Sequence, residues 1–341
     1  MVGPNKDSQG GIATVIRNMI SYNKKNEIIL LNNWEEKKRK ILFVKNFFRI
    51  KRKINRENID IVHFHVAQKG SFYRKSLLLL RIPKKTKTVF HMHASQFDQF
   101  YDQSNFFMKK YIRYILNKAD IVVAVSKRWK DYYSELTKIN IEFINNAVLI
   151  PDQISCDLNA KNIITLGRIG QRKGSYDILK VAEIVQMKDP DIQFYLYGDG
   201  EGEALKQKAL KMKLANLHVK SWINEQEKID LFKHSALHLL PSYHEGLPMA
   251  ILESMSYGIP NVTTDIGGIS TVVTDSVNGF LTAPGETEKM AIIILNYVHL
   301  NHEKKGTVIH NACETIRADF SLDNYNKQWI ELYNKLFENV L

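Results

Sequence analysis

Cysteine is scarce in this sequence, and long hydrophobic runs are missing from it. The only two cysteines, Cys156 and Cys313, stand far apart and form no CxxC pair, so neither a disulfide framework nor a structural zinc site is expected. No stretch approaches the roughly 20 consecutive apolar residues of a membrane-spanning helix, and the first residues lack the pattern of a signal peptide. These absences favour a protein that works in the reducing cytoplasm.

Acidic residues are also scarce in one half of the chain. Residues 1–150 hold 29 Lys and Arg against 12 Asp and Glu, a balance of +17, whereas residues 151–341 hold 19 against 24, a balance of −5. The hydrophobic share of 44% is that of an ordinary folded protein, and 341 residues are enough for two domains. The asymmetry indicates an acidic ligand or surface that meets mainly the first half.

Short β-type runs alternate with helical patterns, which is typical of parallel sheets covered by helices. In the first half we expect strands over Glu27–Leu31, Ile59–Val66, Thr86–Met92, Ile121–Val125 and Ile141–Ile144, and helices over Gly11–Tyr22, Ser71–Arg81, Ser104–Asn117 and Lys127–Thr137. In the second half we expect strands over Asn162–Leu166, Ile192–Tyr197, Leu217–Lys220, Ala236–Leu240, Pro260–Thr263 and Gly279–Thr282. The prediction is an α/β fold with two doubly wound domains, residues 1–150 and 151–320, joined near residues 148–160.

Both ends of the sequence carry a structural expectation. The opening Met1-Val2-Gly3-Pro4 resembles the last turn of a β-strand, so we expect the first strand to be truncated. Residues 321–341 form a helical pattern with Ser321 at the N-cap position. We expect this terminal helix to pack back towards the N-terminal domain.

Two basic residues follow a strand at the start of the second half. Arg168 stands directly after Gly167, and Lys173 precedes Gly174 just before the next helical pattern. Cations at the carboxyl end of a parallel strand, next to a helix N-terminus, suit a diphosphate. A solvated basic loop is the alternative for this segment alone. The glycine-rich turn Tyr197–Gly200 is interpreted as a tight turn between strand and helix.

The segment after the strand Ala236–Leu240 is the richest in the chain. A loop carries Glu245 and Gly246, and a helix is expected to start with Pro248 at its first position. Glu253 falls within an otherwise apolar run of that helix, where a carboxylate needs a partner. Glu245 and Glu253 stand eight positions apart.

The run from Glu245 to Pro260 resembles the signature of the group 1 (family 4) retaining GT-B glycosyltransferases, in which EG-x-P precedes a second Glu and then G-x-P. The resemblance continues through Gly267-Gly268-Ile269 and Asn278–Leu281, and it includes Gly167-Arg168 with Lys173-Gly174 and the turn Gly10-Gly11-Ile12. It thus covers essentially the whole chain, with more specific motifs in the second half. A GT-B fold, with two Rossmann-like domains facing a cleft, is what the resemblance implies.

The resemblance also implies how the donor is bound. Arg168 and Lys173 would hold the donor diphosphate and stabilise the leaving nucleotide, in place of the metal ion of other glycosyltransferases. Glu253 would accept hydrogen bonds from the ribose hydroxyls. Gly10 and Gly11 would let a first-domain loop approach the phosphates, because a Cβ would block that approach.

The transferred sugar has its own implied contacts. Glu245 would face the sugar and stabilise it rather than attack it, and the backbone of Gly246, Leu247 and Pro248 would bind the sugar hydroxyls. The resemblance also places a histidine at the end of a first-domain strand, near the donor sugar.

Several histidines compete for that role. We favour His93, which falls just past a strand, whereas His91 is expected to face a packed sheet surface. His63 and His65 also approach a strand end, and His65 is a candidate for the acceptor side. A structural, hydrogen-bonded histidine is the alternative for each of them.

The sequence Asp189-Pro190-Asp191 matches the DxD pattern that binds a metal in the other glycosyltransferase fold. It lies before a strand rather than after one, so we interpret it as a solvated turn and expect no metal site.

The segment Lys37–Lys53 is basic, aromatic and compatible with a helix. It suits an anionic membrane surface, and the alternative is a sheet-covering helix with a solvated basic face. Many enzymes similar to this family glycosylate lipid-linked precursors of surface polysaccharides. We therefore expect a glycan or lipid-linked acceptor and a peripheral location on the inner face of the membrane. No nucleic-acid recognition motif is present, so nucleic acid is not expected as a partner.

These expectations converge on a retaining, metal-independent transferase. It would move a hexose or N-acetylhexosamine from a UDP-sugar co-substrate to a hydroxyl, without a cofactor, in surface polysaccharide biosynthesis. Two alternatives remain open, a GT-B nucleotide-sugar 2-epimerase and a non-catalytic relative that binds a glycan or partner. The presence of Glu245 and Glu253 together with Arg168 and Lys173 argues against both alternatives.

Overall fold

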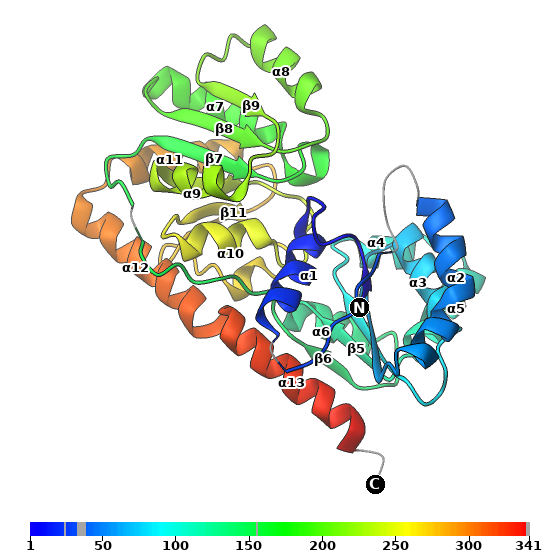
Figure 1. The fold of residues 1–341 in the computed structure, drawn as a ribbon. Helices are drawn as coiled ribbons and strands as arrows, with labels where there is room; N and C mark the ends of the chain where they lie inside the picture. Colours follow the sequence, from blue (N-terminus) through cyan, green and yellow to red (C-terminus); the bar gives the residue numbers. More distant parts are fainter. Residues whose placement is uncertain (24, 33–38, 155, 339–341) are drawn as a thin grey trace. The chain divides into compact units, whose positions relative to one another are not determined.

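The computed structural model describes residues 1–23, 25–32, 39–154 and 156–338. The chain divides into two compact units (Figure 1). Unit 1 consists of Met1–Asn146 together with Leu322–Leu341, and unit 2 is Ala147–Ser321.

Unit 1 contains a six-stranded, fully parallel sheet in the order β2-β1-β3-β4-β5-β6. Its strands are β1 (Val2–Gly3), β2 (Leu31–Asn32), β3 (Ile61–Val66), β4 (Lys87–Met92), β5 (Ile121–Ala124) and β6 (Ile141–Phe143). Its helices are α1 (Gly11–Tyr22), α2 (Arg39–Arg56), α3 (Gly70–Leu79), α4 (Phe97–Asp102), α5 (Phe106–Leu116), α6 (Lys127–Ser134) and α13 (Leu322–Glu338). Helices on both faces explain why residues 62–66 of β3 are all buried.

In unit 1 one predicted strand needs correction, and one helix was missed. The expected strand Glu27–Leu31 is wrong, because only Leu31 and Asn32 pair with β1, which itself offers just Val2 and Gly3. A strand cannot extend beyond its partner's hydrogen bonds. The helix α4 was not predicted, although Phe97, Phe100 and Tyr101 have helical spacing and are buried.

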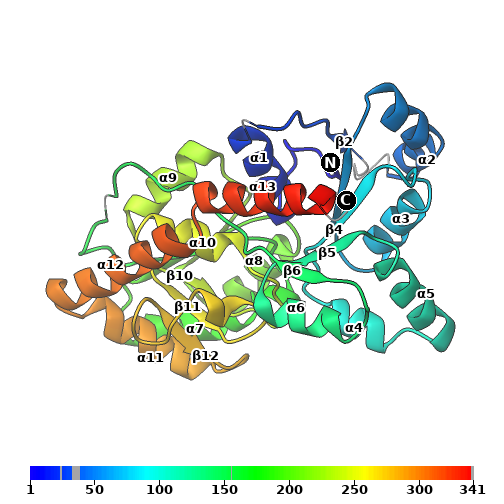
Figure 2. The same cartoon turned by 90° about the horizontal axis from the view of Figure 1, so that it is seen from below.

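The terminal helix α13 follows unit 2 in the sequence but belongs to unit 1. It packs against α1, and Figures 1 and 2 both show these two helices side by side. Trp329 and Tyr333 of α13 are buried against β3, with the Trp329 ring centroid 4.6 Å from that of His63. The last three residues of the predicted helix, 339–341, lie outside the described residues.

Unit 2 contains a second six-stranded parallel sheet, in the order β12-β11-β10-β7-β8-β9. Its strands are β7 (Asn162–Leu166), β8 (Gln193–Tyr197), β9 (Leu217–Lys220), β10 (Ser235–Leu240), β11 (Asn261–Thr264) and β12 (Phe280–Thr282). Its helices are α7 (Asp177–Lys188), α8 (Gly202–Lys211), α9 (Glu225–Lys233), α10 (Met249–Ser256), α11 (Thr287–Val298) and α12 (His302–Asp319), with two short 3₁₀ turns at Gln171–Lys173 and Ile269–Thr271. All six predicted strands of this half are confirmed to within one residue at each end.

The turn before β8 differs from its prediction. Asp191 is exposed, as expected, but Asp189 is buried and accepts hydrogen bonds from Lys161, with Nζ 3.0 Å from Oδ2. His299 Nε2 lies 3.1 Å from the same oxygen. Asp189 is thus a structural ion-pair partner at the amino-terminal edge of the sheet, not a solvated residue.

Within the described ranges, every helix is too short or too polar to cross a bilayer.

Candidate active site

The loops that follow β7 and β10 meet at the carboxyl edge of the unit 2 sheet. The two strands are neighbours, and the backbone N–H of Tyr243 donates to the carbonyl oxygen of Arg172 over 2.9 Å. Gly174 has a φ of +66°, and a Cβ at this position would lie 1.9 Å from the carbonyl oxygen of Pro241. Glycine is therefore required here both for conformation and for the close approach of two loops that are far apart in sequence.

A buried ion pair lies at this junction. Glu245 is only 5% exposed, and its Oε1 accepts hydrogen bonds from Lys173 Nζ at 2.5 Å and from Ser242 Oγ at 2.7 Å. Arg172 Nη1 lies 3.9 Å from the other carboxylate oxygen. Burial alone would raise the pKa of Glu245, but Lys173, Arg172 and the Ser242 hydrogen bond together hold that pKa below its usual value. Glu245 is therefore ionised at neutral pH and fixes the position of Lys173.

Arg168 is more exposed than Lys173. Its side chain is 66% exposed, and Nη1 lies 3.5 Å from Asp199 Oδ2 in the loop after β8.

No role was predicted for Arg172 from the sequence. It adds a cation beside Glu245 and donates to the carbonyl oxygen of His244 at 2.9 Å. Its basic neighbour in the sequence, Lys173, matched the family motif, and only the fold shows that both approach Glu245.

Glu253 has a partner that the sequence did not indicate. Its Oε2 accepts a hydrogen bond from Lys228 Nζ at 3.0 Å, and the same ammonium lies 3.0 Å from Glu225 Oε2. Burial would lower the pKa of Lys228, but the two carboxylates raise it above its usual value, so the lysine stays charged. The four charged side chains of the predicted site are thus distributed over three ion pairs: Lys173–Glu245, Arg168–Asp199 and Lys228–Glu253.

The start of α10 differs by one residue from the prediction. Pro248 is the N-cap, with Met249 as the first helical residue, and Gly246 and Leu247 precede it. Gly268 N–H donates to the carbonyl oxygen of Gly246 at 2.6 Å, so the loop after β11 holds the backbone that leads into the helix. In the first turn of α10 the N–H of Ile251 donates to the carbonyl oxygen of Pro248 at 3.2 Å, and the N–H groups of Met249 and Ala250 before it stand where a helix N-terminus can bind oxygen atoms of a ligand.

In unit 1, the two glycines of the predicted phosphate loop begin α1. Gly10 is the N-cap with a φ of +115°, and Gly11 is the first helical residue. A Cβ at Gly10 would meet no described atom within 4 Å, so conformation, rather than crowding within unit 1, requires glycine here.

The histidines of β3 and β4 form one buried group. His63 Nε2 lies 3.1 Å from His91 Nδ1, and His65 Nδ1 lies 3.0 Å from His93 Nε2. His91 is fully buried, as predicted, and His93 keeps partial exposure just beyond the strand. His65 is also fully buried, so the expectation that it lines the acceptor side is wrong.

The same group has the spacing of a metal site. His63, His65 and His91 offer ring nitrogens within 4.8 Å of one another. The sequence did not indicate this group, because the side chains meet only once β3 and β4 pair with His65 opposite His91. Both ring nitrogens of His63 already have hydrogen-bond partners, His91 and, at 2.7 Å, the Tyr333 hydroxyl. We therefore treat the group as a hydrogen-bonded part of the core.

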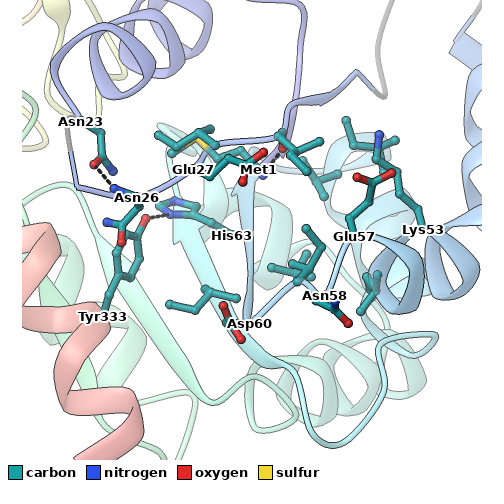
Figure 3. A pocket seen from close by; sticks show the side chains of 18 of the residues that line it. Met1, Asn23, Asn26, Glu27, Lys53, Glu57, Asn58, Asp60, His63 and Tyr333 are labelled. Atoms are coloured by element: carbon teal, nitrogen blue, oxygen red, sulfur yellow. Dashed lines mark hydrogen bonds between the residues drawn. The ribbon is translucent and has the colours of Figure 1, made fainter.

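A cavity of about 520 Å³ lies at the opposite edge of the unit 1 sheet (Figure 3). Met1, Glu27, Asp60 and Tyr333 are among the residues that line it, and Figure 3 shows Tyr333 reaching His63 on one side. Asp60 directly precedes β3, so the cavity is at the amino-terminal ends of the strands. Ligands of open parallel sheets bind at the carboxyl ends, so this cavity is not part of the candidate site.

The chain matches two models of known protein families. Residues 10–149 match the model of Glycosyltransferase Family 4, and residues 150–314 match that of Glycosyl transferases group 1. The chain is a member of this glycosyltransferase family. Its two parallel six-stranded sheets are the GT-B fold.

The relatives that match most of this glycosyltransferase share only a low sequence identity with it. An uncharacterised 41.2 kDa protein in the cps region of Klebsiella pneumoniae is 23% identical over 93% of this chain and 95% of its own. The N-acetyl-alpha-D-glucosaminyl L-malate synthase of Bacillus anthracis is 25% identical over 82% and 75%. The crystal structure of Anabaena HepE in complex with UDP and glucose has a TM-score of 0.75 and 17% identity, with 98% of each chain covered.

Proposed function

We propose that this glycosyltransferase moves a sugar, with retention and without a metal ion, from a UDP-sugar to a hydroxyl of a glycan or lipid-linked acceptor in surface polysaccharide biosynthesis. The observation that carries the proposal is the Lys173–Glu245 pair with Arg172 beside it, at the carboxyl edge of β7 and β10. The nucleotide is suggested by Anabaena HepE, whose structure contains UDP and glucose.

The charges suit the departure of a nucleotide diphosphate. Breaking the bond between sugar and diphosphate places negative charge on the leaving group, and Lys173, Arg172 and Arg168 supply positive charge for it. Glu245 holds Lys173 in place through a short hydrogen bond, so the cation does not need to reorganise during the reaction. In this proposal Glu245 also faces the sugar, and the N–H groups at the start of α10 bind its hydroxyls.

Glu253 is proposed to accept hydrogen bonds from the ribose, and this role can be tested directly. Hydrogen bonds to a charged group are worth roughly 1.5–3 kcal/mol, so Glu253→Ala is expected to weaken UDP binding about 10- to 150-fold. Isothermal titration calorimetry with UDP measures the change, and Glu288→Ala, which removes an exposed carboxylate from α11, is the matched control.

The identity of the donor can be tested with the same purified protein. A panel of UDP-, GDP-, dTDP- and ADP-sugars is compared by thermal shift, since a ligand that binds the native state raises the melting temperature. UDP-sugars are expected to give the largest shifts. Equal UDP affinity in wild type and Glu253→Ala would refute the ribose role, and an unshifted melting temperature with every UDP-sugar would refute the donor.

The membrane contact is proposed to lie on α2. Ile41, Val44 and Phe48 follow one another at helical spacing and are 70%, 52% and 69% exposed. Exposed cations flank them at Lys45 and Arg49, whereas Lys37 and Lys38 of the predicted segment lie outside the described residues. An apolar stripe between cations suits the surface of an anionic bilayer, as for interfacial helices.

Vesicle binding tests this surface. The double variant Ile41→Ser/Phe48→Ser is expected to bind phosphatidylglycerol-containing vesicles at least about tenfold more weakly, because each apolar side chain contributes roughly 1.5–3 kcal/mol when buried. Co-sedimentation measures the binding, with pure phosphatidylcholine vesicles as the uncharged surface. Leu210→Ser, which removes an exposed leucine from α8, should bind like wild type. Unchanged binding by the double variant would contradict the assignment to α2.

A further inference from the structure

A lysine is buried in unit 1, and the described part of the chain gives it no acidic partner. Lys75 of α3 is only 4% exposed, and its Nζ donates to Ser71 Oγ at 2.7 Å. The same hydroxyl accepts a hydrogen bond from the backbone N–H of Ala67 at 3.1 Å. Among the described residues, no carboxylate lies within ion-pair distance of this ammonium, and the charged neighbour that acts on it is another cation, Arg74.

The position of Lys75 makes its burial costly. Side chains of a helix lean towards its N-terminus, so Lys75 reaches back one turn to Ser71, at the positive end of the α3 dipole. The first turn of α3 contains no Asp or Glu to offset this charge. Burial, with Arg74 adding to it, lowers the pKa of Lys75 to about 7. Buried cations are normally paired, so this site lacks an anion.

The site is also in a place where a ligand can reach it. The loop Ala67–Lys69 joins the carboxyl end of β3 to α3, and His93 leaves the carboxyl end of the adjacent strand β4. The backbone N–H of His93 donates to the carbonyl oxygen of Val66 at 2.7 Å, one residue before Ala67, whose N–H donates to Ser71 Oγ, so His93 lies beside the loop that contacts the partner of Lys75. Burial, with the charge of Lys75 adding to it, lowers the pKa of His93 to about 3. His93 keeps partial exposure, and Lys69 and Gly70 at the start of α3 are exposed, so solvent reaches the turn that precedes Ser71.

We propose that Lys75, with Ser71 and the N-terminus of α3, binds an anionic group of the acceptor, a carboxylate or a phosphate. The inference rests on the proposed function, in which the donor diphosphate already has its cations in unit 2 and meets only the backbone of Gly10 and Gly11 from unit 1, so the charge of Lys75 is assigned to the other substrate. The acceptor is then an acidic glycan or a phosphate-containing one. The neutral ring of His93 lies beside the bound anion and adds no charge to it.

The stability of Lys75→Met separates this role from a structural one. Methionine keeps the length and the apolar stem of lysine but removes the buried charge, so the variant is expected to melt at a higher temperature than wild type in buffer without added anion. A lysine that stabilised the fold would give the opposite shift, and that result would overturn the proposal. Lys84→Met, at an exposed lysine of the same unit, controls for the loss of one positive charge.

Anion binding is measured on the full chain with UDP at saturating concentration, so that phosphate does not report on the donor site. Sodium malonate and sodium phosphate are titrated separately at constant ionic strength with chloride, and the melting temperature is followed. Wild type and Lys84→Met are expected to bind one of the two anions at least tenfold more tightly than Lys75→Met. Preference for malonate assigns a carboxylate to the acceptor, and preference for phosphate assigns a phosphate.

Equal anion affinity in wild type and Lys75→Met overturns the proposal, as does the lack of any response to both anions. If UDP fails to stabilise the protein, the proposed donor is wrong, while the comparison of the lysine variants without UDP still decides the anion site. Ser71→Ala removes only the hydroxyl partner and replaces Lys75→Met should that variant not fold.

Discussion

Replacing Lys173 with alanine should lower the rate of sugar transfer about 100- to 1,000-fold, the usual effect of removing one preorganised group that stabilises developing charge. The ammonium is held by Glu245 at the edge where β7 and β10 end, and it is proposed to meet the leaving diphosphate. Single-turnover release of UDP with the best donor of the panel measures the effect. Lys180→Ala, at an exposed lysine of α7, should retain the wild-type rate.

A loss of folding could imitate this result, because Lys173→Ala leaves a buried carboxylate short of its main partner. The double variant Lys173→Ala/Glu245→Gln removes both charges and should regain much of the melting temperature lost by the single variant. Its rate should stay low, since the cation is still missing. A double variant that regains activity along with stability would show that Lys173 acts only through the fold.

Acidification should destabilise unit 1 steeply. Burial lowers the pKa values of His63, His65 and His91 well below the usual 6.5, and it lowers that of His93 to about 3. These rings therefore stay neutral in the folded state at pH values where the same histidines of the unfolded chain take up protons. The free energy of unfolding has its full value above about pH 7 and falls as the pH drops below 6.5. Between pH 6.5 and 5.5 each histidine lowers the free energy of unfolding by roughly 1 kcal/mol, or by about 4 kcal/mol for the four.

Urea unfolding between pH 7.5 and 5.0 tests this expectation. In unit 2 the buried His238, with its pKa lowered to about 4, should add one further proton to the dependence. His91→Gln keeps a hydrogen-bonding side chain and should reduce the slope by about one proton. A stability that is flat from pH 7 to 5 would contradict the burial of these rings.

Much of the fold could be predicted from local sequence patterns. The strands of unit 2 are short apolar runs bounded by glycine and polar residues, and such runs become buried strands wherever helices cover both faces. The strand Glu27–Leu31 could not be predicted correctly, because its length depends on pairing with Val2 and Gly3 rather than on its own residues. The same holds for the contact of α13 with β3, which joins segments about 270 residues apart.

The residues of the candidate site also divide into those that the sequence predicted and those that only the fold revealed. Glu245, Glu253, Arg168 and Lys173 were identified from spacing and family resemblance, whereas Lys228 has no local pattern that would connect it to Glu253. The sequence by itself determined the two α/β sheets and the charged residues at their carboxyl ends, because hydrophobic periodicity and short motifs are local. Only the tertiary structure decided which charges pair, which histidines are buried and that Lys75 has no acidic partner in the described chain, because burial and charge pairing depend on residues that the fold brings together.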